Sequence, residues 1–245
     1  MQGELFAVLV LMTGIAFLYA AIGHGGASGY LAVMAIFNFA PESLRSSALV
    51  MNVVVSIISF YHFQRHQYFS LKLFLPFILG SVPMSFLGAG IQLDSGIYKV
   101  ILGVFLIFAG FRLLGWFGRE QKNIKDLPFL LGLLIGAGIG FVSGLIGIGG
   151  GIILSPVILF FGWGRMKTAA AVSALFIFCN SISGLLGLYI SGYYSPAKEL
   201  TWMVFSVAFG GWMGAYLANT KFSTLGLKRM LTGVLIFAGL KLILI

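Results

Sequence analysis

Charged residues are scarce in this chain: they make up 9% of its 245 residues, whereas hydrophobic residues make up 60%. A soluble domain carries about 25% charged residues and could not hide this much apolar surface from water. No polar domain with a basic, aromatic-rich face occurs, so the net charge of +9 does not indicate nucleic-acid binding. The single cysteine, Cys179, excludes an internal disulfide. The composition predicts an integral membrane protein.

The apolar stretches also lack the groups on which membrane enzymes and pumps depend. They contain no Asp or Glu, because Glu42, Asp94 and Glu199 fall near predicted loops. His62 and His66 are four residues apart but have no third metal ligand nearby. No nucleophile–base pair and no phosphate-binding GxxxxGK[ST] motif is present. We therefore expect neither an enzyme nor an ATP-driven pump, and we expect no metal and no cofactor.

Long apolar segments are abundant, near the length of about 20 residues that crosses a bilayer core. Those of the first half cover residues 5–22, 27–39, 46–63, 71–91 and 96–114. Those of the second half cover residues 128–146, 152–161, 169–190, 200–218 and 225–245. The second segment of each half is short, since residues 27–39 reach only about 20 Å as a helix. This pattern predicts an all-α polytopic membrane protein in which a long and a short helix open each half.

The two halves repeat one another in sequence. Residues 14–26 match residues 138–150, residues 47–49 (Ser-Ala-Leu) match residues 173–175, and residues 106–110 match residues 235–239. Ordered matches at a nearly constant offset are not expected by chance. They predict a first repeat at 1–115, a linker at 116–127 and a second repeat at 128–245.

The short segments bear on how the repeats sit in the membrane. Each opening pair is either a full helix plus a short one or two half-helices, and both arrangements return the chain to its starting side. Each half then crosses an odd number of times, which predicts two inverted repeats of five segments. If the loops between the ten segments lie on alternate sides of the membrane, four basic residues fall on one side and the rest on the other. The four are Arg45, Lys99, Lys198 and Lys241. By the positive-inside rule the linker is cytoplasmic, and both termini lie outside the cell (inner) membrane.

Glycine-rich breaks separate the long and short segments, at residues 23–26 and 147–151. Backbone without helical partners persists at membrane depth only beside protein or a water-filled cavity. The start of the following helix carries partial positive charge and free N–H groups, which suit an anion. We expect the breaks to meet near the midplane and to bind substrate through Gly25, Gly26, Gly149, Gly150 and Gly151. The alternative is that these glycines only permit close packing or a tight turn.

Polar side chains near the breaks are further candidates for the site. His24 has Ile148 as its counterpart in the second half. It either donates to an anion or carries a proton, or else it bonds a backbone carbonyl. The other candidates, which either bind an anion without adding charge or form interhelical hydrogen bonds, are Ser28, Ser47, Asn52, Ser173 and Asn180.

Small residues recur at a spacing of four in three segments. They are Gly132, Gly136, Gly140 and Gly144, and also Gly210 and Gly214, with Ser81 and Ser85 in a first-half segment. Small residues at this spacing let helices approach closely. The stripes are also suited to the contact of a homodimer.

The paired Gly-rich loops, the short segments after them and the Ser-rich third segments resemble the TauE/SafE family of sulfite and organosulfonate exporters. The resemblance covers essentially the whole chain; the second loop, followed by Pro156, is the closer match, whereas the first contains His24 and no matching proline. It implies transport of sulfite, sulfoacetate or related sulfonates across the inner membrane, usually outward. The leading hypothesis is a secondary transporter that works by alternating access. A passive anion channel of the same architecture is the alternative. A membrane enzyme or assembly scaffold is a third, which the missing catalytic cluster disfavours.

Overall fold

The computed structural model describes residues 2–21, 23–113, 124–217 and 225–244, which form helices and loops without a β-strand. The all-α fold class is confirmed. Seven helices are long and apolar enough to cross a membrane, while α2, α7 and the apolar part of α10 are shorter. The helices are α1 (Gln2–Ala21), α2 (Ala27–Ile36), α3 (Pro41–Arg65), α4 (Leu71–Ala89), α5 (Ser95–Leu113), α6 (Phe129–Ile146), α7 (Gly151–Phe161), α8 (Met166–Ile190), α9 (Leu200–Leu217) and α10 (Leu225–Leu244).

The third helix of each half is longer than its apolar run. Helix α3 begins at Pro41 instead of residue 46, and α8 begins at Met166 instead of residue 169; both have 25 residues. Proline is favoured in the first turn of a helix, where its missing N–H is no loss. The added turns of α3 contain Glu42 and Arg45, so Arg45 belongs to a membrane-spanning helix and not to a loop.

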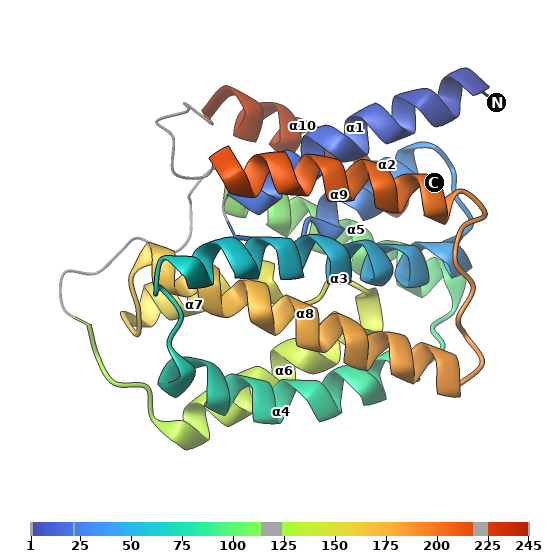
Figure 1. Ribbon diagram of the computed structural model, residues 1–245. Helices are drawn as coiled ribbons and strands as arrows, with labels where there is room; N and C mark the ends of the chain where they lie inside the picture. Colours follow the sequence, from blue (N-terminus) through green and yellow to red (C-terminus); the bar gives the residue numbers. More distant parts are fainter. Residues whose placement is uncertain (1, 22, 114–123, 218–224, 245) are drawn as a thin grey trace.

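The helices lie side by side and nearly along one direction, with both termini at the same end of the bundle (Figure 1). We call this the termini end, and the opposite end the linker end. Helix α1 starts at the termini end and α2 returns to it (Figure 1). In the second half α6 starts at the linker end and α7 returns to that end (Figure 1). Because α1 has 20 residues and α2 has 10, the opening pair is a full helix plus a short one.

The packing partners of the two halves correspond. Helix α1 packs on α9 and α6 packs on α4, while α3 packs on α8 and α5 on α10. Each helix has its counterpart five places along the chain. Exchanging counterparts turns the α1–α9 contact into the α6–α4 contact and leaves α3–α8 and α5–α10 unchanged. Such pairing is what halves related by a twofold rotation would give. That the repeats are inverted across a membrane, and that residues 1–115 and 128–245 bound them, stay predictions.

The glycine stripes hold helices together within the chain. A Cβ atom on Gly136, Gly140 or Gly144 of α6 would run into backbone carbonyls of α4, and one on Gly210 or Gly214 of α9 into carbonyls of α1. The close approach predicted from their spacing is therefore present in α4–α6 and α1–α9. Both stripes are occupied inside one chain, so the predicted homodimer would need another surface.

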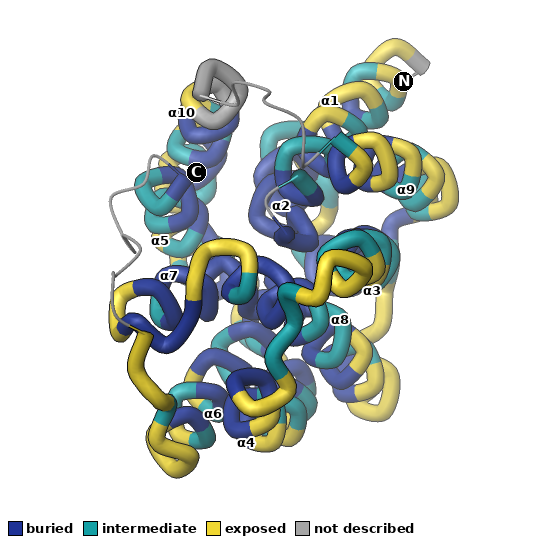
Figure 2. Tube along the Cα trace, turned by 60° about the vertical axis from the view of Figure 1, so that its left-hand side comes forward, coloured by how far each residue is buried: buried dark blue, intermediate teal, exposed yellow. Residues whose placement is uncertain are grey.

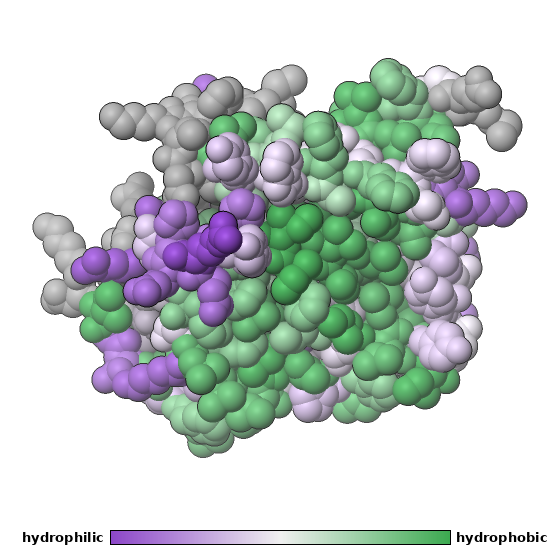
Figure 3. Space-filling model, viewed as in Figure 1, coloured by the Kyte–Doolittle hydropathy of each residue, from purple (hydrophilic) through white to green (hydrophobic). Residues whose placement is uncertain are grey.

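Burial and hydropathy follow the arrangement expected in a bilayer. Buried residues gather in the middle of the bundle and exposed ones along its outside (Figure 2). Residues 27–35 of α2 are all buried. The face in Figure 3 is hydrophobic across its middle, with hydrophilic residues gathered mainly toward the linker end. Large apolar side chains such as Leu130 and Phe205 are each 67% exposed, as lipid-facing residues are.

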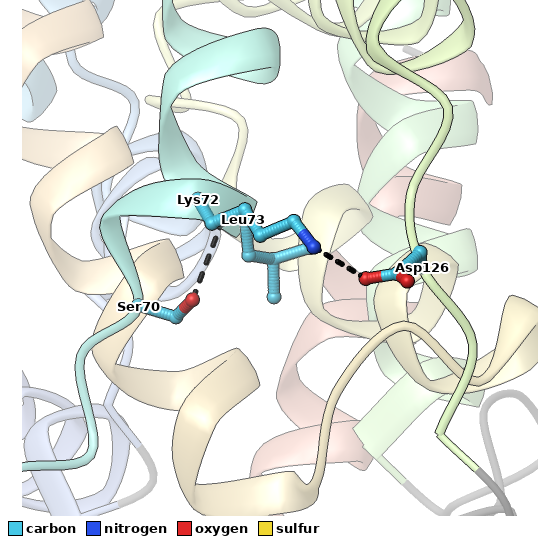
Figure 4. Close-up of polar contacts among 4 residues, drawn as sticks. All are labelled: Ser70, Lys72, Leu73 and Asp126. Atoms are coloured by element: carbon cyan, nitrogen blue, oxygen red, sulfur yellow. Dashed lines mark hydrogen bonds and ion pairs between the residues drawn. The ribbon is translucent and has the colours of Figure 1, made fainter.

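An ion pair fastens the chain before α6 to the start of α4 (Figure 4). Lys72 Nζ donates to Asp126 Oδ1 at 2.6 Å, and both side chains are exposed. The hydrogen bond from Lys72, together with its charge, lowers the pKa of the Asp126 carboxyl. Beside this pair, the hydroxyl of Ser70 caps α4 by accepting from the backbone N–H of Leu73 at 3.4 Å. Of the predicted linker, residues 116–123 lie outside the described part of the chain.

Candidate functional site

Each glycine break leads directly into a short helix, whose N-cap is the last glycine before the helix. The N-cap of α2 is Gly26, with φ +92°, and the N-cap of α7 is Gly150, with φ +77°. These are left-handed backbone conformations that glycine adopts without strain. Neither glycine has a side chain to accept a hydrogen bond from the first turn. The first N–H groups of α2 and α7 lack intrahelical acceptors and favour negative charge nearby.

The two breaks meet at the same two side chains, one from the middle of α3 and one from the middle of α8. A Cβ atom on Gly25 would lie 2.6 Å from Asn52 Oδ1 and 2.9 Å from Ile177 Cγ2. A Cβ atom on Gly149 would lie 2.8 Å from Asn52 Nδ2 and 2.8 Å from Ile177 Cγ2. The structure therefore brings together the breaks that the sequence separates by half the chain. Their depth in a membrane and their binding of substrate stay predictions.

Asn52 is the most unusual side chain at this meeting point. It is fully buried, and neither its amide nitrogen nor its amide oxygen has a hydrogen-bond partner among the residues that the structure describes. Leaving a buried polar group unsatisfied costs about 1–3 kcal/mol, and such a group in a native protein calls for a functional or solvent-based explanation. Ser181 Oγ, which lies 3.0 Å from a Cβ built on Gly149, is also buried and unpartnered. Tyr30 Oη, beside Gly26, is likewise buried without a hydrogen-bond partner among the described residues.

His24 connects the first break to the second half. Its Nε2 lies 3.2 Å from Ser155 Oγ of α7, and Ser155 Oγ lies 2.8 Å from Ser173 Oγ of α8. All three side chains are buried. The predicted candidates His24 and Ser173 are thus brought together, through a serine that the sequence analysis did not select.

The other predicted polar candidates occupy different environments. Ser28 Oγ lies 2.6 Å from Tyr19 Oη, beside the first break. Asn180 Nδ2 donates to the carbonyl of Phe176 in its own helix, at 2.9 Å. Its Oδ1 is buried without a partner. Ser47 is not in this cluster, because its hydroxyl accepts from the backbone N–H of Ala197, in the loop between α8 and α9.

The space between the breaks is a small enclosed cavity. Tyr19, Ser28 and the first break line it from one half, and Ile148, Ile152 and Ile177 line it from the other. Its volume is about 10 Å³, which holds roughly one water molecule. The described conformation is therefore occluded at the centre.

A much larger vestibule opens at the termini end. Its volume is about 610 Å³, and its walls come from the start of α3, the loop between α4 and α5, and the end of α8. Arg45 and Tyr98 line it from the interior side. The sequence analysis counted Arg45 only as one of the sparse basic residues of this end. Its place in α3 was hidden because polar residues interrupt the apolar run there.

Comparison with known proteins agrees with the helices and the paired breaks. Residues 6–242 match the family described as Sulfite exporter TauE/SafE. The chain is 35% identical to "Probable membrane transporter protein y4hK" of Sinorhizobium fredii over 99% of this chain and 100% of the relative. It is 27% identical to "Probable membrane transporter protein YunE" of Bacillus subtilis over 83% of this chain and 81% of the relative. No solved structure matches it. With a family match over nearly its whole length and transporters as relatives, the chain belongs to the TauE/SafE sulfite exporter family of membrane transporters.

Proposed function

We propose that the protein is a secondary transporter that exports small sulfur-containing anions, such as sulfite, sulfoacetate or related sulfonates, by alternating access. The substrate would bind between the two glycine breaks. The observation that carries this proposal is Asn52, a fully buried amide without a partner that lies against both Gly25 and Gly149. A ligand between the breaks would satisfy this amide and the starts of two helices at once.

The chemistry of this cluster suits a small oxyanion. Asn52 Nδ2 and the hydroxyls of Ser181 and Tyr30 are neutral donors without partners. The N-terminal ends of α2 and α7 add partial positive charge. Oxygen atoms of a sulfite or sulfonate group accept hydrogen bonds from several directions, as this arrangement requires. A site without a full positive charge, apart from a protonated His24, also lets the anion leave again.

The occluded centre favours a carrier over a passive channel. The cavity between the breaks, about 10 Å³, is far too small for a sulfur oxyanion. The large vestibule reaches the interior from the termini end, where Arg45 and Tyr98 close it. A protein that is open on one side and closed at its centre needs a conformational change to move its substrate, as alternating access provides.

The orientation we propose is linker inside and termini outside the cell (inner) membrane. Basic residues near the linker end include Arg65 at the end of α3, Lys72 in the first turn of α4, and Arg165 and Lys167 at the start of α8. Excess Lys and Arg in short loops marks the cytoplasmic side.

The test is flux into proteoliposomes containing the purified protein, with sulfite, sulfoacetate, thiosulfate and sulfate, in the presence and absence of a pH gradient. We expect saturable, gradient-dependent flux of at least one of these anions. Asn52→Leu should lower kcat/KM by about tenfold or more, the effect of losing a hydrogen bond to a charged ligand. Ser56→Ala is the matched control, because Ser56 is buried in the same helix and bonds its own backbone.

The outcomes separate the alternatives. Flux that rises with concentration without saturating would show a channel. Flux of none of the four anions would refute the substrate class. Equal activity in Asn52→Leu and Ser56→Ala would move the site away from the breaks.

A further inference from the structure

Arg45 is a largely buried cation at the inner wall of the vestibule. Its side chain crosses to the ends of two other helices, and the residue is only 7% exposed. Its Nη2 donates to the carbonyl of Ala89 at 2.7 Å and to that of Gly144 at 3.1 Å, and Nη1 donates to the carbonyl of Ile91 at 3.1 Å. These carbonyls belong to the ends of α4 and α6, where a positive charge is favoured by the helix dipole. Arg45 thus joins α3 and α4 of the first half to α6 of the second.

Glu42 and Asp94 are both wall residues of the same vestibule, but within the part of the chain that the structure describes neither forms an ion pair with Arg45. Asp94 Oδ1 instead accepts from the backbone N–H of Gly96 at 2.8 Å, at the start of α5. Glu42 lies in the first turn of α3, where a negative charge is favoured. The hydrogen-bond partners of the Arg45 guanidinium are therefore backbone carbonyls.

Arg45 is replaced by an alanine at the equivalent contact of the other half. A Cβ atom on Gly147 would lie 3.0 Å from the Cα of Arg45, so the second break rests on Arg45. The corresponding glycine of the first break, Gly23, rests on Ala170, whose Cα is also 3.0 Å from such an atom. Equivalent contacts thus hold an arginine toward the termini end and an alanine in the other half.

Arg45 and Tyr98 also separate the vestibule from the central cavity. Tyr98 Oη donates to the carbonyl of Ile146 at 3.1 Å, and Arg45 donates to that of Gly144. Both acceptors lie just before Gly147, and Ile148, one residue further, lines the central cavity. These two hydrogen bonds therefore tie the vestibule wall to the end of α6, directly before the cavity-lining Ile148.

We propose that the vestibule is a second anion site, whose ligand is Arg45, and that the Arg45–Gly144 and Tyr98–Ile146 hydrogen bonds are the gate between it and the central site. This proposal rests on the proposed function. An oxyanion in the vestibule competes with the α6 carbonyl for the guanidinium, so binding loosens the gate. Because Ala170 stands in the equivalent place of the other half, this site is not repeated there.

The experiment compares Arg45→Gln with Lys198→Gln, which removes an exposed charge from the loop before α9 at the termini end. The KM for sulfite is measured separately from each side of proteoliposomes whose protein orientation is fixed by cleavage of a terminal tag. In Arg45→Gln the KM from the vestibule side should rise about tenfold while that from the linker side changes less than about twofold. Lys198→Gln should change neither.

Two further variants guard against a merely structural effect. Arg45→Lys keeps the charge and should recover most of the vestibule-side affinity. Tyr98→Phe keeps the ring and Arg45, so it should leave that KM unchanged and raise the exchange rate by weakening the gate. Equal KM changes on both sides of the Arg45→Gln vesicles, or no change on either, would overturn the proposal.

A binding measurement decides the matter even if no flux is found. The melting temperature of the purified protein is measured in sulfite and in gluconate at equal ionic strength. We expect stabilisation by sulfite that persists in Asn52→Leu and disappears when Arg45→Gln is added to Asn52→Leu. Equal stabilisation of Asn52→Leu and of this double variant would refute the vestibule site, whereas absent flux with Arg45-dependent stabilisation would refute only the transport of the anions tested.

Discussion

The amide oxygen of Asn52 occupies the space that a side chain at Gly25 would need, 2.6 Å from a Cβ atom built there. Its amide nitrogen stands in the same relation to Gly149, at 2.8 Å. One side chain of α3 therefore controls how closely both breaks can approach the centre. Neither break accepts even a methyl group unless Asn52 or Ile177 moves.

This contact predicts that alanine at either break impairs transport. In Gly25→Ala and Gly149→Ala the new methyl group displaces Asn52, so we expect kcat/KM to fall by about tenfold or more, as when a well-placed hydrogen-bonding group is lost. Initial rates of sulfite flux into proteoliposomes measure the effect.

The controls are the matched glycines Gly14 in α1 and Gly138 in α6, where an added Cβ would meet nothing within 4 Å. Alanine there should leave flux unchanged and stabilise the helix by up to about 1 kcal/mol. A loss of flux in the controls as large as at the breaks would show that α1 and α6 need flexible glycines along their whole length.

His24 predicts a pH dependence of substrate binding. Its Nε2 contacts Ser155 of the second half, and the ring lines the central cavity together with Tyr19. Histidine ordinarily gains its charge between pH 8 and 5. A protonated ring adds positive charge beside the anion, so the KM for a sulfonate should fall as the pH is lowered. His24→Gln, which keeps a neutral donor, should flatten this profile without changing the melting temperature.

Flux and KM are measured from pH 5 to pH 8, with a sulfonate whose charge stays constant in this range. Ser155→Ala keeps the histidine but removes its contact, and it should retain a pH-dependent KM. An identical profile in wild type and His24→Gln would exclude the proton role.

The sequence predicted the helices and the breaks well, because both leave strong local signals. Runs of apolar residues identify spans, and glycine clusters inside them mark interruptions. The polar residues around Asn52 were harder to find. Tyr30, Ser155 and Ser181 lie in mainly apolar helices, where a hydroxyl looks the same whether it faces a cavity or a neighbouring helix.

The two serines matched by the repeat illustrate a second difficulty. The sequence match pairs Ser47 with Ser173, but the contacts of the breaks pair Arg45 with Ala170, which sets Ser47 against Val172. The match is therefore one residue out of register in this helix. One residue is about 100° of rotation, enough to turn one serine toward the site and the other toward a loop.

This register difference yields a prediction for the two serines. Ser47→Ala removes the acceptor of the Ala197 N–H, 2.9 Å away. It should lower the free energy of unfolding by about 1 kcal/mol and leave the KM unchanged. Ser173→Ala removes the hydroxyl that contacts Ser155, so it should change the KM or its pH profile. Thermal unfolding and flux are measured on both variants; a KM change in Ser47→Ala would place Ser47 at the site after all.

The packing of α6 on α4 predicts a variant, Gly140→Ala, that lowers the stability of the protein. A Cβ atom on Gly140 would collide with the backbone carbonyl of Ser81, and a backbone carbonyl cannot rotate away as a side chain can. Gly140→Ala must therefore push the two helices apart, which should lower the free energy of unfolding by about 1–3 kcal/mol, the usual effect of overpacking. Gly138→Ala, on the open face of the same helix, is again the control.

The same variant tests whether this smooth interface also slides during transport. If α4 and α6 move as one unit, the Gly140→Ala protein that remains folded should keep the wild-type turnover rate, because the site at Asn52 is untouched. If instead the stripe is a moving surface, turnover should fall together with the melting temperature. The carbonyls that accept from Arg45 and Tyr98 belong to α6, the same helix as the glycine stripe. We therefore expect the first result. The movement that opens the vestibule gate would then lie between α6 and α3, and not between α6 and α4.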